Sequence, residues 1–127
     1  MSQNCIVSNK TRNVIPFVPF EAIKNEVLGT DYVLSVAIVT PVEIQKLNLT
    51  YRNINKPTDI LSFPLSEKEG EIYICISETK KEAVKFDRSY ENFLAFIFIH
   101  GCVHLKGYDH GGTMEGIEEK IRNKFKV

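Results

Sequence analysis

Apolar side chains recur along this chain with two different periods, one typical of helices and one typical of strands. Helical spacing predicts helices over residues 17–28, 41–51, 77–86 and 90–105 and from about residue 113 onward. Gly29 and Gly107 stand where a helix-ending glycine is expected. The stretch Thr40-Pro-Val-Glu43 has the form of a capping box with proline at the first helical position, and Ser77 and Thr113 are expected to cap later helices.

Runs of β-branched and aromatic residues predict strands over residues 5–7, 32–39, 59–63 and 71–75. Pro64 is expected to end the third strand. The charged segment 66–70 should form a turn, so that the last two strands pair as an antiparallel hairpin. Because strands and helices do not alternate strictly, we expect an α+β fold. It should be a single domain over residues 1–127, with a mixed sheet of about four strands covered by four to five helices.

Composition adds limits on the class of protein. The 127 residues suit one domain, and 16 basic residues balance 16 acidic ones, so any nucleic-acid surface must be a local patch. Cys5, Cys75 and Cys102 form no CxxC pair and are expected to be free thiols in a reducing compartment. No signal peptide is evident at the start, and the longest apolar run, residues 93–99, is too short to span a bilayer. We expect a soluble cytoplasmic protein.

All three histidines of the chain lie in one stretch, His100-Gly-Cys-Val-His104-Leu-Lys-Gly-Tyr-Asp-His110. A separation of four residues rotates a helix by about 400°, so His100 and His104 should project from one face, a turn apart. Once Gly107 has ended the helix, His110 can supply a third ligand from the loop. A lone histidine on an apolar helix is more often a hydrogen-bonded core residue, but this concentration favours a metal site at the end of the long helix.

Three neutral imidazoles leave the fourth position of a tetrahedral zinc ion for water, which is typical of catalytic zinc. Such a water can have its pKa lowered to about 7, which provides a hydroxide nucleophile at neutral pH. We therefore predict one zinc ion on His100, His104 and His110 that serves hydrolysis. Imidazoles also accept nickel, copper and iron, so the sequence does not identify the metal used in the cell.

The residues around the histidines carry further expectations. Cys102 is rotated by about 200° from His100 and should be a core residue, and Tyr108 should serve packing. Asp109 is a candidate catalytic-site residue that would orient an imidazole as a hydrogen-bond acceptor, although a role in the turn explains it equally well. Gly101 occupies the position where the zinc-protease motif His-Glu-x-x-His has its general base, which argues against a protease.

A second unusual stretch covers residues 47–64. Arg52 falls at the end of a predicted helix, where a cation is favourable in any protein, but its planar guanidinium would also suit a phosphate. Thr58 and Asp59 either form a turn or fix the edge of a strand beside the metal.

Taken together, these stretches resemble the YbeY family of bacterial rRNA maturation factors. The family pattern HGxLHLxGYDH reads here as HGCVHLKGYDH, with Val103 in place of leucine. The pattern LNxxYRxxxxPTDVLSFP reads as LNLTYRNINKPTDILSFP, with Ile60 in place of valine. Residues 70–75 resemble the family's GDI-like strand, and the order and spacing agree over about residues 47–110. After His110, the short segment 111–114 departs from the longer acidic segment that family members commonly have.

The resemblance implies a metal-dependent endoribonuclease specific for single strands. It implies zinc on His100, His104 and His110, with Arg52 as the functional arginine of the cleft. It further implies ribosomal RNA as substrate, in particular the 3′ end of 16S rRNA, and the small ribosomal subunit as partner in ribosome assembly or quality control. The sequence indicates no oligomeric state.

Two other functions are compatible with the residues themselves. One is a ribosome-assembly binding factor with a structural metal, which the balanced charge and the missing protease glutamate allow. The other is a zinc hydrolase of another substrate class, such as a peptide or small ester.

Overall fold

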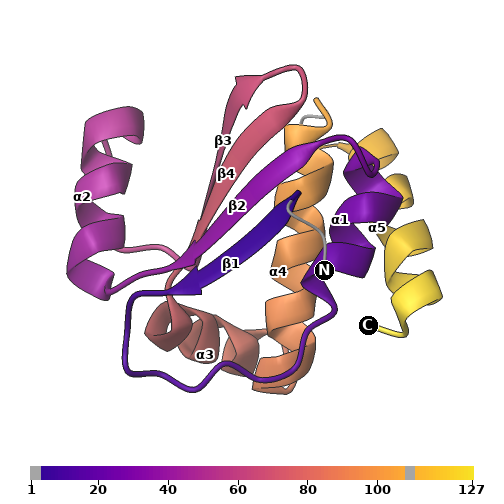
Figure 1. Ribbon diagram of the computed structural model, residues 1–127. Helices are drawn as coiled ribbons and strands as arrows, with labels where there is room; N and C mark the ends of the chain where they lie inside the picture. The colour runs from indigo at the N-terminus through magenta and orange to yellow at the C-terminus, as the bar shows by residue number, and fades with distance from the viewer. Residues whose placement is uncertain (1–3, 108–110) are drawn as a thin grey trace.

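The computed structural model describes residues 4–107 and 111–127 of the chain (Figure 1). Along the chain its elements are β1 (Cys5–Asn9), α1 (Phe20–Leu28), β2 (Val33–Ile38), α2 (Pro41–Arg52), β3 (Ile60–Ser66), β4 (Glu69–Ile74), α3 (Ile76–Lys85), α4 (Tyr90–Leu105) and α5 (Gly112–Phe125). The expected α+β fold is confirmed, with a mixed sheet of four strands and five helices in the described residues. Within that part of the chain, no helix is long and apolar enough to cross a membrane.

The strands form one sheet in the order β1-β2-β4-β3. β1 and β4 each run parallel to β2, and β3 runs antiparallel to β4, so the predicted hairpin is confirmed. The prediction that Pro64 ends the third strand is wrong, because β3 continues to Ser66 with an irregular register after Pro64. The reason is the place of β3 at the edge of the sheet, where a residue without an N–H leaves no partner unsatisfied. The turn is also shorter than expected and consists of Glu67 and Lys68.

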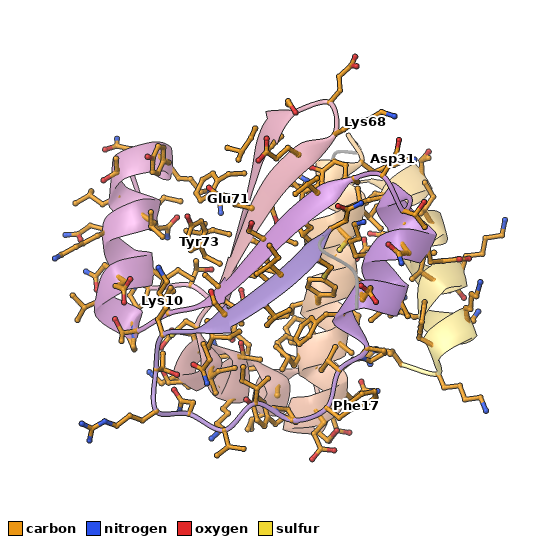
Figure 2. All side chains as sticks on the ribbon, viewed as in Figure 1. Lys10, Phe17, Asp31, Lys68, Glu71 and Tyr73 are labelled. Carbon is orange, nitrogen blue, oxygen red and sulfur yellow. The ribbon has the colours of Figure 1, made fainter. Side chains whose placement is uncertain are left out.

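The helices cover the two faces of the sheet unequally. α2 lies on one side of the sheet, while α1, α3, α4 and α5 lie on the other (Figure 1). The main core forms on the side of α4, which contributes ten buried residues, and it includes side chains from β2, β4 and the other three helices on that side. A smaller core under α2 centres on Ile44 and Leu61. Figure 2 shows Glu71 and Tyr73 of β4 on the side that faces α2, so alternate residues of this strand serve the two faces.

Local signals placed some helix ends correctly and others wrongly. Thr40 caps α2 as predicted, with its Oγ1 accepting from the Glu43 N–H at 3.2 Å. The expected caps at Ser77 and Thr113 are wrong, because α3 begins at Ile76 directly after β4 and α5 begins at Gly112. α1 begins later than predicted, at Phe20. The cause is Pro19, which disfavours helical geometry in the residue before it.

Candidate active site

The long helix α4 carries His100 and His104 near its C-terminal end. Their rings are nearly parallel, with an interplanar angle of 5° and 6.4 Å between centroids, so both project from one face of the helix. Both line the same cavity, whose volume is about 310 Å³. His110 and Asp109 lie outside the described residues, so their predicted roles as third ligand and orienting group stay predictions.

His100 is oriented by a residue that the sequence reasoning did not single out. The carboxylate Oε1 of Glu118 lies 2.9 Å from His100 Nδ1, and Glu118 is buried, with 5% of its surface exposed. In the neutral tautomer whose Nδ1–H donates a hydrogen bond to the Glu118 carboxylate, Nε2 carries the lone pair that a metal ligand needs. Glu118 falls within the apolar stripe that Met114, Ile117 and Ile121 form on α5. A glutamate in such a stripe could have been identified from the sequence as a buried polar residue.

Gly101 explains how α4 comes so close to the sheet. A Cβ atom at this position would lie 2.9 Å from Ile60 Cδ1 and 2.9 Å from Ser62 Oγ, closer than ordinary packing allows. The glycine thus lets the helix pack directly on β3, which brings His100 and His104 to the edge of that strand. A larger residue at this position would require the Ile60 and Ser62 side chains to move.

Arg52 reaches the same cavity from the other side of the sheet. It is the last residue of α2, its side chain is exposed, and it lines the cavity together with both histidines. The loop that follows is held by the buried Asn48, whose Nδ2 donates to the carbonyl of Lys56 at 2.9 Å. Asn53 permits the turn by adopting a left-handed conformation, with φ of 58°. The helix end and its loop therefore place a guanidinium in the same cavity as two imidazoles.

A second cavity of about 300 Å³ adjoins the first and is lined by Thr58, Asp59 and Glu82 as well as by Arg52 and His100. The pKa of the Asp59 carboxyl is raised, mainly because the group is buried and also because Glu82 carries a negative charge nearby. The Asp59 carbonyl accepts from the Cys75 N–H at 2.9 Å. Asp59 thus begins the pairing of β3, and both side chains line a cavity with His100, which supports the second reading, a pair that fixes the strand edge beside the site.

Cys102 is fully buried, as predicted from its rotation away from the histidines. Burial raises the pKa of its thiol well above the usual value, so the thiolate is disfavoured. The three cysteines are free thiols, as expected. Cys102 therefore belongs to the core of the protein and takes no part in the cavity.

The fold and the cavity define a class of protein: a small α+β domain in which one helix presents two imidazoles to a cleft shared with an arginine. The family model described as endoribonuclease YbeY matches residues 2–126. Curated relatives with this same name include proteins from three bacteria. The chain is 41% identical to the one from Buchnera aphidicola over 73% of this chain and 65% of that protein. It is 41% identical to the one from Staphylococcus carnosus over 80% of this chain and 74% of that protein, and 35% identical to the one from Aliarcobacter butzleri over 95% and 91%.

A solved structure shares the fold. The solution structure of a Thermotoga maritima protein superimposes with a TM-score of 0.65 at 25% sequence identity, covering 96% of this chain and 91% of that one. The chain belongs to the YbeY endoribonuclease family. The names of the family and of these relatives describe endoribonucleases, which are hydrolases that act on RNA. The chain spans 65% of the length of the Buchnera relative.

Proposed function

We propose that this protein is a zinc-dependent endoribonuclease that cleaves single-stranded RNA, with His100, His104 and His110 as the metal ligands. The observation that carries the proposal is the shared cavity, in which Arg52 and two parallel imidazoles meet at the edge of β3. The donor set fits zinc, because imidazole nitrogen is a common zinc ligand and His100 has its other ring nitrogen bound by a buried carboxylate. When bound, zinc supplies a Lewis acid for a phosphoryl oxygen and an acidified water.

The chain's own residues have separate tasks in this proposal. Glu118 holds the His100 ring in one tautomer and one orientation, so that Nε2 is available without rearrangement. Arg52 donates hydrogen bonds to the scissile phosphate, and its planar fork can contact two phosphoryl oxygens at once. Gly101 keeps the helix against β3 and so keeps the imidazoles in the same cavity as the arginine.

The finer assignment of the substrate rests on the family. We propose that the RNA is ribosomal, in particular the 3′ end of 16S rRNA, and that the protein works with the small ribosomal subunit in the cytoplasm during assembly or quality control. The overall charge is balanced, with 16 basic and 16 acidic residues, so binding relies on local cations such as Arg52. Its affinity for RNA should accordingly weaken with added salt.

Purified protein with single-stranded RNA tests the proposal. We expect the intact chain to cleave, His104→Ala to lose cleavage, and the exposed, remote Arg12→Ala to behave like the intact chain. Circular dichroism shows whether each variant is folded. Cleavage that survives both chelation and His104→Ala would contradict the mechanism, whereas variants that unfold and an intact protein that never cleaves would favour a binding factor with a structural metal.

A further inference from the structure

The second cavity, which we call the aromatic cavity, continues from the proposed active site. Arg52, Ile60 and His100 line both cavities, so the two spaces meet at the arginine and the first histidine. A nucleotide whose phosphate lies at Arg52 can therefore place its base in the aromatic cavity. This inference rests on the proposed function, because RNA is the occupant that the continuity suggests.

One wall of the aromatic cavity is a stack of phenylalanine rings. Phe86 stacks on Phe93 with 5.4 Å between centroids at 20°, and Phe93 stacks on Phe96 with 5.6 Å at 15°. Phe86, the outermost ring, has 57% of its surface exposed. It is held there at the end of α3 by a turn in which Asp87 adopts a left-handed conformation, with φ of 53°. An exposed ring that extends a stack at the wall of a cavity is a surface on which a nucleobase can stack.

The lining of the aromatic cavity also includes hydrogen-bond acceptors. Asp59 and Glu82 both line the cavity, and the Glu82 carboxylate already pairs with the Lys85 ammonium at 2.9 Å. None of the ion pairs within the described residues involves Asp59, and the Thr58 hydroxyl donates to its Oδ1 at 3.4 Å. The carboxylate also accepts hydrogen bonds from the Ile60 and Asp59 backbone N–H groups, yet burial still raises its pKa. An ionised carboxylate has about four lone-pair sites, so acceptor positions remain for donors from a ligand.

Base chemistry identifies the donors that fit one carboxylate. Guanine presents N1–H and N2–H side by side on its Watson–Crick edge, which matches two carboxylate oxygens. Adenine and cytosine place a ring acceptor beside their amino group, and uracil places its N3–H between two carbonyls, so each would set an acceptor against the carboxylate.

We propose that the aromatic cavity is a guanine subsite, in which Phe86 stacks on the base and Asp59 accepts hydrogen bonds from N1–H and N2–H. The enzyme would then cut RNA next to guanosine.

Cleavage specificity provides the first test. Single-stranded oligonucleotides that differ at one position, G, A, C or U in an otherwise uniform sequence, are cleaved by the full chain, and kcat/KM is measured for each. We expect cleavage at G to exceed that at U by about tenfold or more, and Phe86→Ala to lower cleavage at G by about tenfold, in the range of one lost stacking contact. Phe86→Trp should restore it. Val84→Ala is the matched control, since Val84 lies on the same helix and is 80% exposed.

Asp59→Asn tests the recognition of the base edge. An amide offers one acceptor where the carboxylate offers two, so the ratio of cleavage at G to cleavage at U should fall toward one. Equal cleavage at all four bases by the intact chain, or a ratio that Asp59→Asn leaves unchanged, overturns the proposal.

Binding provides a readout that does not depend on cleavage. Guanosine 5′-monophosphate, added to the full chain with labelled isoleucine methyl groups, should shift the resonances of Ile60 and Ile97, which line the cavity, and uridine 5′-monophosphate should shift them much less. If RNA is cleaved without base preference and these shifts are absent, the subsite is refuted while the proposed function stands. If the shifts appear but no RNA is cleaved, the subsite is supported and the proposed function fails.

Discussion

Glu118 gives the most informative single substitution, because it contacts the proposed site through one hydrogen bond. Its carboxylate is buried and accepts from His100 Nδ1 at 2.9 Å. In Glu118→Gln the shape is kept, but a charged acceptor becomes a neutral one. A hydrogen bond to a charged group contributes about 1.5–3 kcal/mol, against about 0.5–1.5 kcal/mol for a neutral pair. The difference is of order 1 kcal/mol, so the His100 ring is held less firmly in its orientation.

Outer partners of metal-binding histidines typically change metal affinity by about 10–100-fold when they are removed. We therefore expect Glu118→Gln to weaken zinc binding by about tenfold, and Glu118→Ala to weaken it further. The assay is a zinc titration of the full chain against a competing chelator at neutral pH, followed by heteronuclear NMR or circular dichroism to confirm the fold.

The matched control is Glu119→Gln, which removes the same charge from the exposed neighbour on α5. If Glu118→Gln binds zinc as tightly as Glu119→Gln and the intact chain, the orienting role of Glu118 is refuted. If both variants weaken binding equally, the effect comes from the general charge of the helix, and the hydrogen bond to His100 is again not its cause.

Three further predictions concern packing, phosphate binding and pH. Gly101→Ala gains about 1 kcal/mol of helix propensity, but its Cβ would lie 2.9 Å from Ile60 Cδ1 and Ser62 Oγ, and overpacking of this kind costs about 1–3 kcal/mol. Denaturant unfolding should therefore show a net loss of stability. A gain in stability would contradict the close contact. Arg52→Ala should lower kcat/KM on RNA by about tenfold to a hundredfold, because it loses one charged hydrogen bond to phosphate, while the zinc content stays unchanged. If the variant cleaves RNA as fast as the intact chain, Arg52 has no part in the mechanism. Burial raises the pKa of Asp59, so its charged form destabilises the folded state above that pKa. Asp59→Asn should be more stable than the intact chain at neutral pH, and this advantage should disappear as the pH falls through the carboxyl range. An advantage that grows on acidification would show that the pKa of Asp59 is lowered in the folded state.

Local signals in the sequence predicted some helix ends and missed others, since the caps expected at Ser77 and Thr113 are wrong. The capping box at Thr40 and the extent of α4 follow from residues close in the chain, and both agree with the structure. The end of β3 could not be predicted in this way. Whether Pro64 stops a strand depends on its place in the sheet, and the edge position of β3 is a property of the whole topology.

The residues of the candidate site also differ in whether local sequence or the whole fold determines their position. His100 and His104 could be paired from helix geometry, because their relation is local. Arg52 was assigned to the site because the motif around it resembles that of a family. Helix geometry alone does not predict that it lies near the histidines, since this depends on how α2 and β3 are joined. Glu118 was readable as a polar residue in an apolar stripe, but which group it contacts depends on how α5 packs on α4. Phe86 becomes a cavity wall through the turn between α3 and α4, and no periodicity in its own segment indicates this.

The central claim is that zinc on His100, His104 and His110 is required for RNA cleavage. The most direct measurement removes metal from the full chain and follows cleavage of a single-stranded RNA as zinc is titrated back. We predict that cleavage is lost on depletion and rises in proportion to added zinc until it levels off at about one equivalent per chain. Undiminished cleavage by the metal-depleted protein, or restoration that needs no zinc, would contradict the claim.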